Sequence, residues 1–228
     1  MSIWTRITDV IASIGESVGG FLQSVVSRNP APPEKSVAFT IGMIALGAKM
    51  AKADGVVTAS EIAAFKQVFH IPDGELQAVA RVFNLAKQDT AGFETYARQI
   101  ARLFSAQHAI LEDVLDGLFH IAKADNAFHP GEHGFLAQVA EIFGFTPVDF
   151  ARIRARHVAD ADDPYVILGV AREAAPEDIR RRYRDLVREY HPDRHIAAGL
   201  PPEMIDIATQ RLQKVNEAYE RIMTEKAA

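Results

Sequence analysis

The sequence predicts an all-α protein, and three observations support this fold class. Apolar residues recur at the three- and four-residue spacing of a helix face through most of the chain. Between these segments, apolar and polar residues nowhere alternate over a length useful for a strand. The tetrapeptide Ala-Lys-Ala-Asp occurs at 51–54 and again at 122–125, so the middle of the chain is expected to consist of two related helical units.

The spacing of apolar residues over 1–29 predicts one amphipathic N-terminal helix. Asp9 and Glu16 lie on its polar face, and they make a membrane span of roughly 20 residues costly. We therefore expect a helix that lies peripherally on a membrane. The alternative is docking on a partner helix or homodimer formation, because acidic residues do not attract anionic lipids. The apolar face consists of Ile3, Ile7, Val10, Ile11, Ile14, Val18, Phe21, Leu22 and Val25.

Two helical domains are expected after this segment. A proline-rich linker at 30–34 precedes a first domain at 35–157, and a polar, acidic linker at 158–162 precedes a second domain at 163–228. Helical spacing in the first domain predicts helices over 37–50, 62–69, 76–85, 93–104, 110–121 and 135–143.

Four acidic residues recur in register in the two units and have two interpretations. Their carboxylates could together hold a hard divalent cation. The favoured alternative is helix capping, because Thr58 stands three residues before one of these acids, and Pro130 suits a first helical position just before another. The four residues are Asp54, Glu61, Asp125 and Glu132.

The second domain predicts a helical hairpin with an exposed tip. Pro176 suits a first helical position, and Pro192 ends the helix that follows, so the tripeptide His191-Pro192-Asp193 is expected at the tip. A second helix is expected over 204–222. The short apolar run at 165–170 is compatible with either a strand or a helix. The apolar face of the first helix consists of Ile179, Tyr183, Leu186, Val187 and Tyr190.

A stripe of guanidinium groups borders this apolar face and suits docking on an acidic partner surface. The alternative is a solvated face in which Glu177 pairs with Arg181 and Asp178 pairs with Arg182, each pair worth a few tenths of a kcal/mol. The stripe consists of Arg180, Arg181, Arg184 and Arg188.

Residues 163–226 resemble a J domain, the module with which DnaJ-type proteins stimulate ATP hydrolysis by a DnaK-type chaperone. The matching pattern is YxxLG from Tyr165, IRRRYRDLVREYHPDR at 179–194 and NEAYE at 216–220. The chain departs from this pattern at Asp185, where the family often has a basic residue. The resemblance implies that His191, Pro192 and Asp193 are required for the ATPase response and that Arg180, Tyr183 and Arg184 occupy contact positions, and we add Arg188 from the stripe.

The stretch GLP-x-EM at 199–204 resembles the DjlA branch of J proteins. In that branch a membrane anchor precedes a TerB-like helical domain and a C-terminal J domain. The Ala-Lys-Ala-Asp repeats, each with a Glu seven residues after the Asp, resemble TerB at 35–157, and related TerB domains are associated with metal at such acids. The polar N-terminal face departs from the anchor pattern.

Composition limits the class of function. The chain has no Cys, which excludes disulfides and cysteine chemistry, and its net charge of −5 argues against a general nucleic-acid binder. It contains no glycine-rich phosphate loop, and no Ser/His/Asp spacing indicates a catalytic site, so we expect no enzyme. Histidines 108, 120 and 157 are expected to be ordinary surface or core residues.

We therefore expect a bacterial stress-response co-chaperone whose partners are a DnaK-type ATPase and an unfolded or specific client protein. The TerB-like domain would serve targeting or sensing. No cofactor is required on this hypothesis, although a divalent cation in that domain is the alternative. We expect the protein in the cytoplasm or at the cytoplasmic face of the inner membrane. The second hypothesis is a TerB-like metal-dependent stress sensor or scaffold, with the J domain as an accessory docking module.

Overall fold

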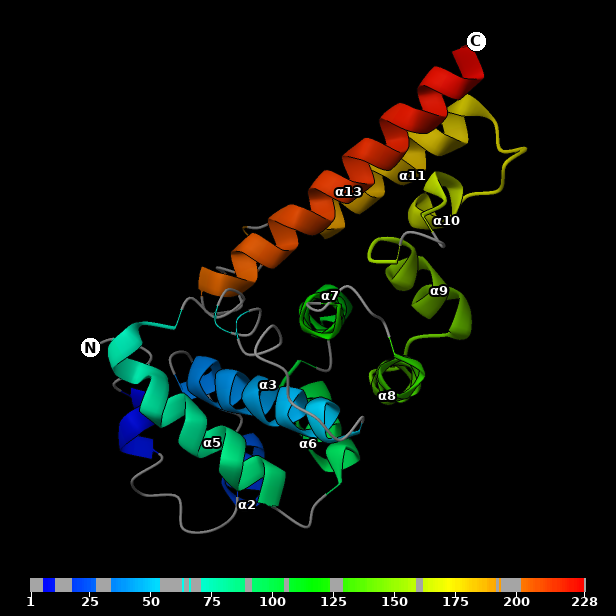
Figure 1. The fold of residues 1–228 in the computed structure, drawn as a ribbon. Coiled ribbons are helices and arrows are strands. Elements are labelled where there is room, and N and C mark those ends of the chain that lie inside the picture. Colours follow the sequence, from blue (N-terminus) through cyan, green and yellow to red (C-terminus); the bar gives the residue numbers. More distant parts are fainter. Residues whose placement is uncertain are drawn as a thin grey trace.

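The computed structural model describes residues 6–10, 18–27, 34–53, 63, 66, 71–88, 92–104, 107–123, 129–158, 162–191, 193 and 202–227. All regular structure within these ranges is helical, which confirms the predicted fold class (Figure 1). The helices form a larger N-terminal bundle and a C-terminal hairpin that extends away from it (Figure 1).

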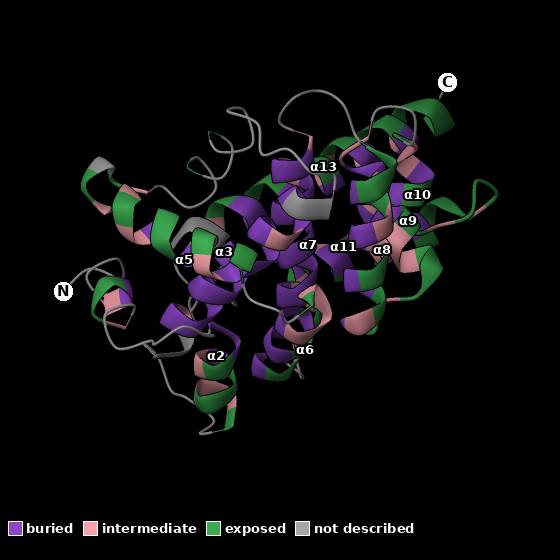
Figure 2. Ribbon diagram, turned by 60° about the horizontal axis from the view of Figure 1, so that its bottom comes forward, coloured by how far each residue is buried: buried purple, intermediate pink, exposed green. Residues whose placement is uncertain are grey.

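Helix α3 (Glu34–Ala53) is the centre of the N-terminal bundle. It is apolar on nearly all sides, as expected for a helix that neighbours cover all round, and Phe39 and Ile44 are fully buried. Figure 2 shows α3 and α7 as the most deeply buried helices. Its neighbours are α2 (Val18–Ser27), α5 (Leu76–Gln88), α6 (Phe93–Leu103), α7 (His108–Ala122) and α8 (Pro130–Ile142), and the short 3-10 helix η1 (Asp73–Glu75) precedes α5.

The expected helices over 37–50, 76–85, 93–104, 110–121 and 135–143 correspond to α3, α5, α6, α7 and α8, with ends that differ by a few residues. The helix expected at 62–69 lies outside the described residues, apart from positions 63 and 66. Helix α9 (Pro147–Ala155) was not predicted. Its sequence signal is a capping box, in which the amide of Thr146 donates to Asp149 at 3.0 Å and the amide of Asp149 donates back to Thr146 at 3.2 Å.

The N-terminal segment packs on this bundle at described positions of its apolar face, while the membrane or partner association expected of it stays a prediction. Ile7, Val18 and Leu22 are fully buried in the same core as α3. The side-chain amide of Gln99 on α6 donates to the carbonyl of Gly19 at 3.0 Å. An amphipathic pattern identifies a face that must be covered, and here the chain itself covers it.

The described N-terminal helical residues are 6–10 and α2, and residues 11–17 lie outside the description. Within the ranges that the structure describes, no helix is both long and apolar enough to cross a membrane.

The C-terminal part consists of α10 (Pro164–Leu168), α11 (Pro176–Glu189) and α13 (Pro202–Ala227). The apolar run at 165–170 therefore forms a short helix. Gly169 ends it at φ 68°, a left-handed conformation that favours glycine. Helices α11 and α13 lie side by side as the predicted hairpin (Figure 1). Ile179, Leu186 and Val215 are fully buried between these elements.

Candidate functional site

The His-Pro-Asp tripeptide follows the end of α11. The helix ends at Glu189, and the amide of Tyr190 still donates to the carbonyl of Leu186 at 2.9 Å. His191 and Asp193 are exposed, and the Asp193 amide donates to His191 Nδ1 at 3.3 Å. The expected termination of the helix and the exposure of these two side chains are confirmed, while Pro192 lies outside the described residues.

The arginine stripe is exposed along α11 beside the tripeptide. Arg180, Arg184 and Arg188 are all exposed. Arg188 lies 3.6 Å from Asp185, an exposed pair that contributes little to stability. The guanidinium groups that the sequence placed on one face are therefore accessible to a partner.

The two ion pairs proposed for the solvated-face alternative were wrong in their partners. Arg181 pairs with Asp178, three residues earlier, instead of Glu177. Arg182 is half-buried, and its Nε donates to the carbonyl of Leu168 at 3.2 Å. The reason is geometric, because α10 ends at Leu168 and leaves carbonyl groups without helical partners, which a nearby guanidinium can satisfy. Arg182 thus joins α11 to α10.

Tyr183 is half-buried between the two helices of the hairpin. Its hydroxyl donates to Asn216 at 3.0 Å, and its ring stacks on Tyr219 with 4.1 Å between centroids. This residue, which the resemblance assigned to partner contact, therefore also fixes the pairing of α11 with α13.

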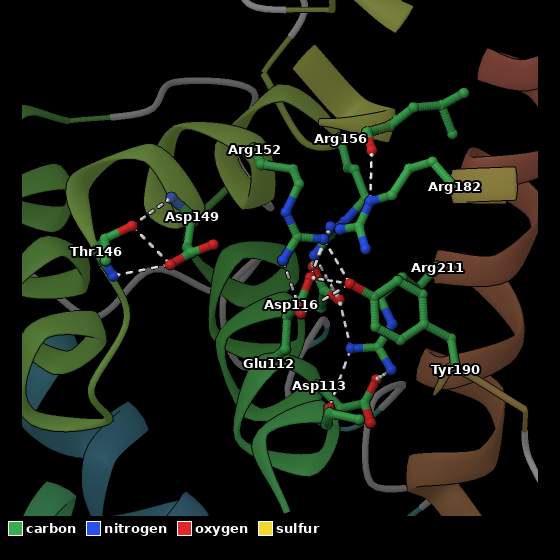
Figure 3. Close-up of polar contacts among 12 residues, drawn as sticks. Glu112, Asp113, Asp116, Thr146, Asp149, Arg152, Arg156, Arg182, Tyr190 and Arg211 are labelled. Atoms are coloured by element: carbon green, nitrogen blue, oxygen red, sulfur yellow. Dashed lines mark hydrogen bonds and ion pairs between the residues drawn. The ribbon is translucent and has the colours of Figure 1, made fainter. Parts of the chain in front are cut away.

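Tyr190, which directly precedes the tripeptide, is fully buried and is hydrogen-bonded to the N-terminal bundle (Figure 3). Its hydroxyl accepts a hydrogen bond from Arg152 of α9 and donates to Glu112 of α7, with 3.0 Å between Tyr190 Oη and Glu112 Oε2. Arg152 and Glu112 also pair directly at 3.1 Å. The residue that immediately precedes His191 is therefore bonded to side chains from two helices of the other domain.

Arg211 of α13 makes a second connection between the domains. Its guanidinium lies 2.8 Å from Asp113 of α7, and both side chains are fully buried. It also donates to the carbonyl of Ala109 at 3.0 Å and lies over the ring of Tyr190, 3.8 Å from the centroid. One cation thus contacts both α7 and the base of the tripeptide loop.

Arg156, the residue that follows the last residue of α9, is the third buried arginine of this region. It lies 2.8 Å from Glu112 and 2.8 Å from Asp116. His157 Nε2 is 2.6 Å from Asp116, and its ring stacks on Phe119 at 4.9 Å between centroids. We call the following set the interdomain charge cluster: Glu112, Asp113 and Asp116 of α7, Arg152 of α9 with Arg156 and His157 just after it, and Tyr190 and Arg211 of the C-terminal hairpin.

Three arginines offset three carboxylates in this cluster, and the pKa values reflect that pairing. Burial acts to raise the pKa of Glu112, but the neighbouring arginines outweigh it and lower the value. Burial opposes ionisation of Asp116 as well, and Arg156 with His157 lowers its pKa. Burial lowers the pKa of His157, so its neutral ring donates to Asp116. Burial, followed by the Glu112 carboxylate, raises the pKa of Tyr190 to about 12.

The interdomain charge cluster was not predicted from the sequence. A usable signal was present on α7, where Glu112 and Asp116 share a face four residues apart in a helix whose residues are mostly apolar. Arg152 and Arg156 show the same spacing. His157, which was expected to be an ordinary surface or core residue, is largely enclosed, with its side chain 13% exposed, and it belongs to this cluster.

Of the four acids with two interpretations, the structure describes Glu132 alone. The amide of His129 donates to Glu132 at 2.9 Å in a capping box at the start of α8, which confirms the capping interpretation at this position. Asp54, Glu61 and Asp125 lie outside the described residues, so the four-carboxylate site stays a prediction. Among the residues that the structure does describe, no group of three or more His, Asp or Glu side chains is placed to hold a metal ion.

A helical hairpin that presents an exposed His and Asp at its tip, beside an arginine face, defines the C-terminal part as a J domain. Comparison with known families agrees: the DnaJ domain matches residues 163–227, and the tellurite resistance protein TerB family matches residues 40–155. The chain belongs to the DjlA family of co-chaperones.

Relatives named co-chaperone protein DjlA align with most of this chain. The protein from Coxiella burnetii is 30% identical over 194 residues, which cover 76% of this chain and 72% of the relative. The protein from Vibrio parahaemolyticus is 27% identical over 93% of this chain and 84% of its own length. The Photobacterium profundum protein is 28% identical over 91% and 84%. No solved structure matches the chain significantly.

Proposed function

We propose that this protein stimulates ATP hydrolysis by a DnaK-type chaperone through the tip of its J domain and directs that chaperone to client proteins. The observation that carries the proposal is the exposure of His191 and Asp193 immediately beyond α11, the helix on which Arg184 is also exposed. The TerB-like domain would act as the targeting or sensing module.

The charge of α11 supports a role in docking. Arg180 and Arg184 are exposed on α11, so their guanidinium groups can meet an acidic partner surface. Opposite charges on two surfaces accelerate encounter and fix orientation more than they increase affinity. In this proposal the arginine face brings the partner into register, and the tripeptide produces the ATPase response.

The proposal is tested by steady-state ATPase measurements on a DnaK-type chaperone with the full-length protein. His191→Gln should abolish stimulation without unfolding the domain, because the side chain is exposed. His133→Gln on α8 is the matched control, since His133 is also exposed but belongs to the other domain. Stimulation by His191→Gln at the wild-type level would overturn the proposal, as would an inactive wild-type protein with every DnaK-type partner of its organism.

A further inference from the structure

We infer that the TerB-like domain sets the orientation of the J-domain tip and that Tyr190 is the positioning residue through which it does so. The inference rests on the proposed function, because it concerns the same tripeptide. It adds that α7 and α9 of the other domain hold the partner-binding tip of the J domain in its orientation.

The position of Tyr190 in the chain is the first step. It is the C-cap residue of α11 and directly precedes His191, so its backbone is the base of the tripeptide loop. Its hydroxyl is bonded to Glu112 and Arg152, which belong to α7 and α9. Any rotation of the tip relative to the bundle must therefore break these two hydrogen bonds or carry the bundle with it.

The surrounding charges make one orientation strongly preferred. Glu112 and Arg152 are buried, and they also pair with each other at 3.1 Å. A buried charge that loses its partner is costly, so a tilted hairpin is disfavoured, because it would separate the buried Arg211 from Asp113 and the Tyr190 hydroxyl from Glu112. Arg211 adds a further constraint, because its guanidinium covers the Tyr190 ring while pairing with Asp113.

The linker at 158–162 alone would let the two domains move independently. The structure opposes such movement at both ends of the hairpin. Helices α10 and α9 are in contact near the linker, and α13 contacts α7 further away. The partner chaperone would then approach a tip whose direction is fixed by the TerB-like domain, which allows that domain to influence the ATPase response without touching the partner.

Tyr190→Phe in the full-length protein is the informative variant. It retains the buried ring under Arg211 and removes only the hydroxyl that bonds to Glu112 and Arg152. Tyr165→Phe is the matched control, because Tyr165 is also a buried tyrosine and its ring lies under Arg172 of the J domain itself. Arg152→Lys is a second route to the same loss, since a lysine keeps the charge but cannot contact both partners in the geometry of a guanidinium.

The first measurement is the distance between the domains. The chain has no Cys, so spin labels can be placed uniquely at Gln138→Cys on α8 and Asp185→Cys on α11, both exposed positions. The distance distribution should be narrow in the wild-type background and in Tyr165→Phe. It should broaden or shift in Tyr190→Phe and in Arg152→Lys, although circular dichroism still shows folded protein.

The second measurement is ATPase stimulation by unlabelled protein as a function of its concentration. Tyr190→Phe removes the hydroxyl that fixes the orientation of the tip, and its free-energy cost is about that of one net hydrogen bond. The maximal stimulation should therefore fall by roughly twofold to tenfold. The half-saturating concentration should change little, because the exposed arginine face is intact. Tyr165→Phe should match the wild type in both quantities.

Unchanged distance distributions in both Tyr190→Phe and Arg152→Lys would overturn the inference, and so would unchanged maximal stimulation in an active protein. If the wild-type protein stimulates no DnaK-type ATPase, the proposed function fails. The distance measurement then still decides whether Tyr190 fixes the orientation of the tip.

Discussion

The guanidinium of Arg211 lies 2.8 Å from the carboxylate of Asp113, and neither side chain is accessible to solvent. The pair joins α13 of the J domain to α7 of the TerB-like domain. Two ions leave water at considerable cost, so such a pair persists only where its geometry and further hydrogen bonds compensate. The two domains of this chain therefore form a joint structure instead of two units on a flexible linker.

Arg211→Ala should destabilise the protein by about 3–5 kcal/mol, because it removes the buried cation that pairs with the buried carboxylate of Asp113. Lys214→Ala on the same helix is the control. Lys214 pairs with Glu217 at 2.8 Å, but both side chains are about half exposed, and a surface pair contributes about 0–1 kcal/mol. Urea denaturation measures both variants, and equal losses would contradict the buried interface.

Acid should weaken the interdomain charge cluster. The pKa values of Glu112 and Asp116 lie below their ordinary values of 4.5 and 3.8 in the folded protein. The unfolded chain therefore binds more protons in this range, and the stabilisation is complete above pH 4.5 and is lost as pH falls below it.

The acid effect is measured by the free energy of unfolding between neutral pH and pH 3. It should decline below about pH 4.5, the ordinary value of Glu112. Asp116→Asn should show a shallower decline than the wild type, whereas Asp185→Asn at an exposed position should retain the wild-type slope. A wild-type slope in Asp116→Asn would show that this carboxylate does not contribute to acid sensitivity.

Local patterns were sufficient for the J-domain hairpin. The spacing of Ile179, Leu186 and Tyr190 specified the buried face of α11, and Pro192 specified its end. By contrast, Glu112 and Tyr190 are 78 positions apart, and nothing in either local sequence pairs them. Contacts between domains depend on which surfaces of the folded domains pack together, and helical periodicity does not specify this.

The N-terminal segment also shows what helical periodicity cannot predict. Periodicity correctly placed Val18 and Leu22 on an apolar face, but it could not say what covers that face. A membrane, a second chain and the protein's own core all satisfy the same amphipathic pattern. The structure selects the core at the described positions.

Arg184→Glu should weaken binding to a DnaK-type chaperone by roughly tenfold at low salt, because it places a negative charge in the arginine face. Arg98→Glu on α6 is the matched control, since Arg98 is also exposed but lies on the TerB-like domain. Arg182→Glu is a poor comparison, because Arg182 bonds to the Leu168 carbonyl and its loss would disturb the hairpin.

The binding should be measured by surface plasmon resonance at several salt concentrations. The difference between Arg184→Glu and wild type should shrink as salt rises, because exposed charges are screened beyond about 10 Å at 0.1 M. Equal weakening by Arg98→Glu would show that net charge, and not the α11 face, governs the encounter.

Leu22→Ala tests whether the N-terminal helix belongs to the folded core. Leu22 is fully buried against the bundle, so its truncation should cost about 2–5 kcal/mol in the free energy of unfolding. Gln23→Ala, at the next and exposed position of α2, should change stability by less than about 0.5 kcal/mol. Both values come from urea denaturation of the full-length protein without lipid. If the two variants were equally stable, Leu22 would not be packed in the core, and its apolar face would again be open to a membrane or a partner. A large loss of unfolding free energy in Leu22→Ala alone would instead show that α2 stabilises the bundle whose helices α7 and α9 contact the J domain.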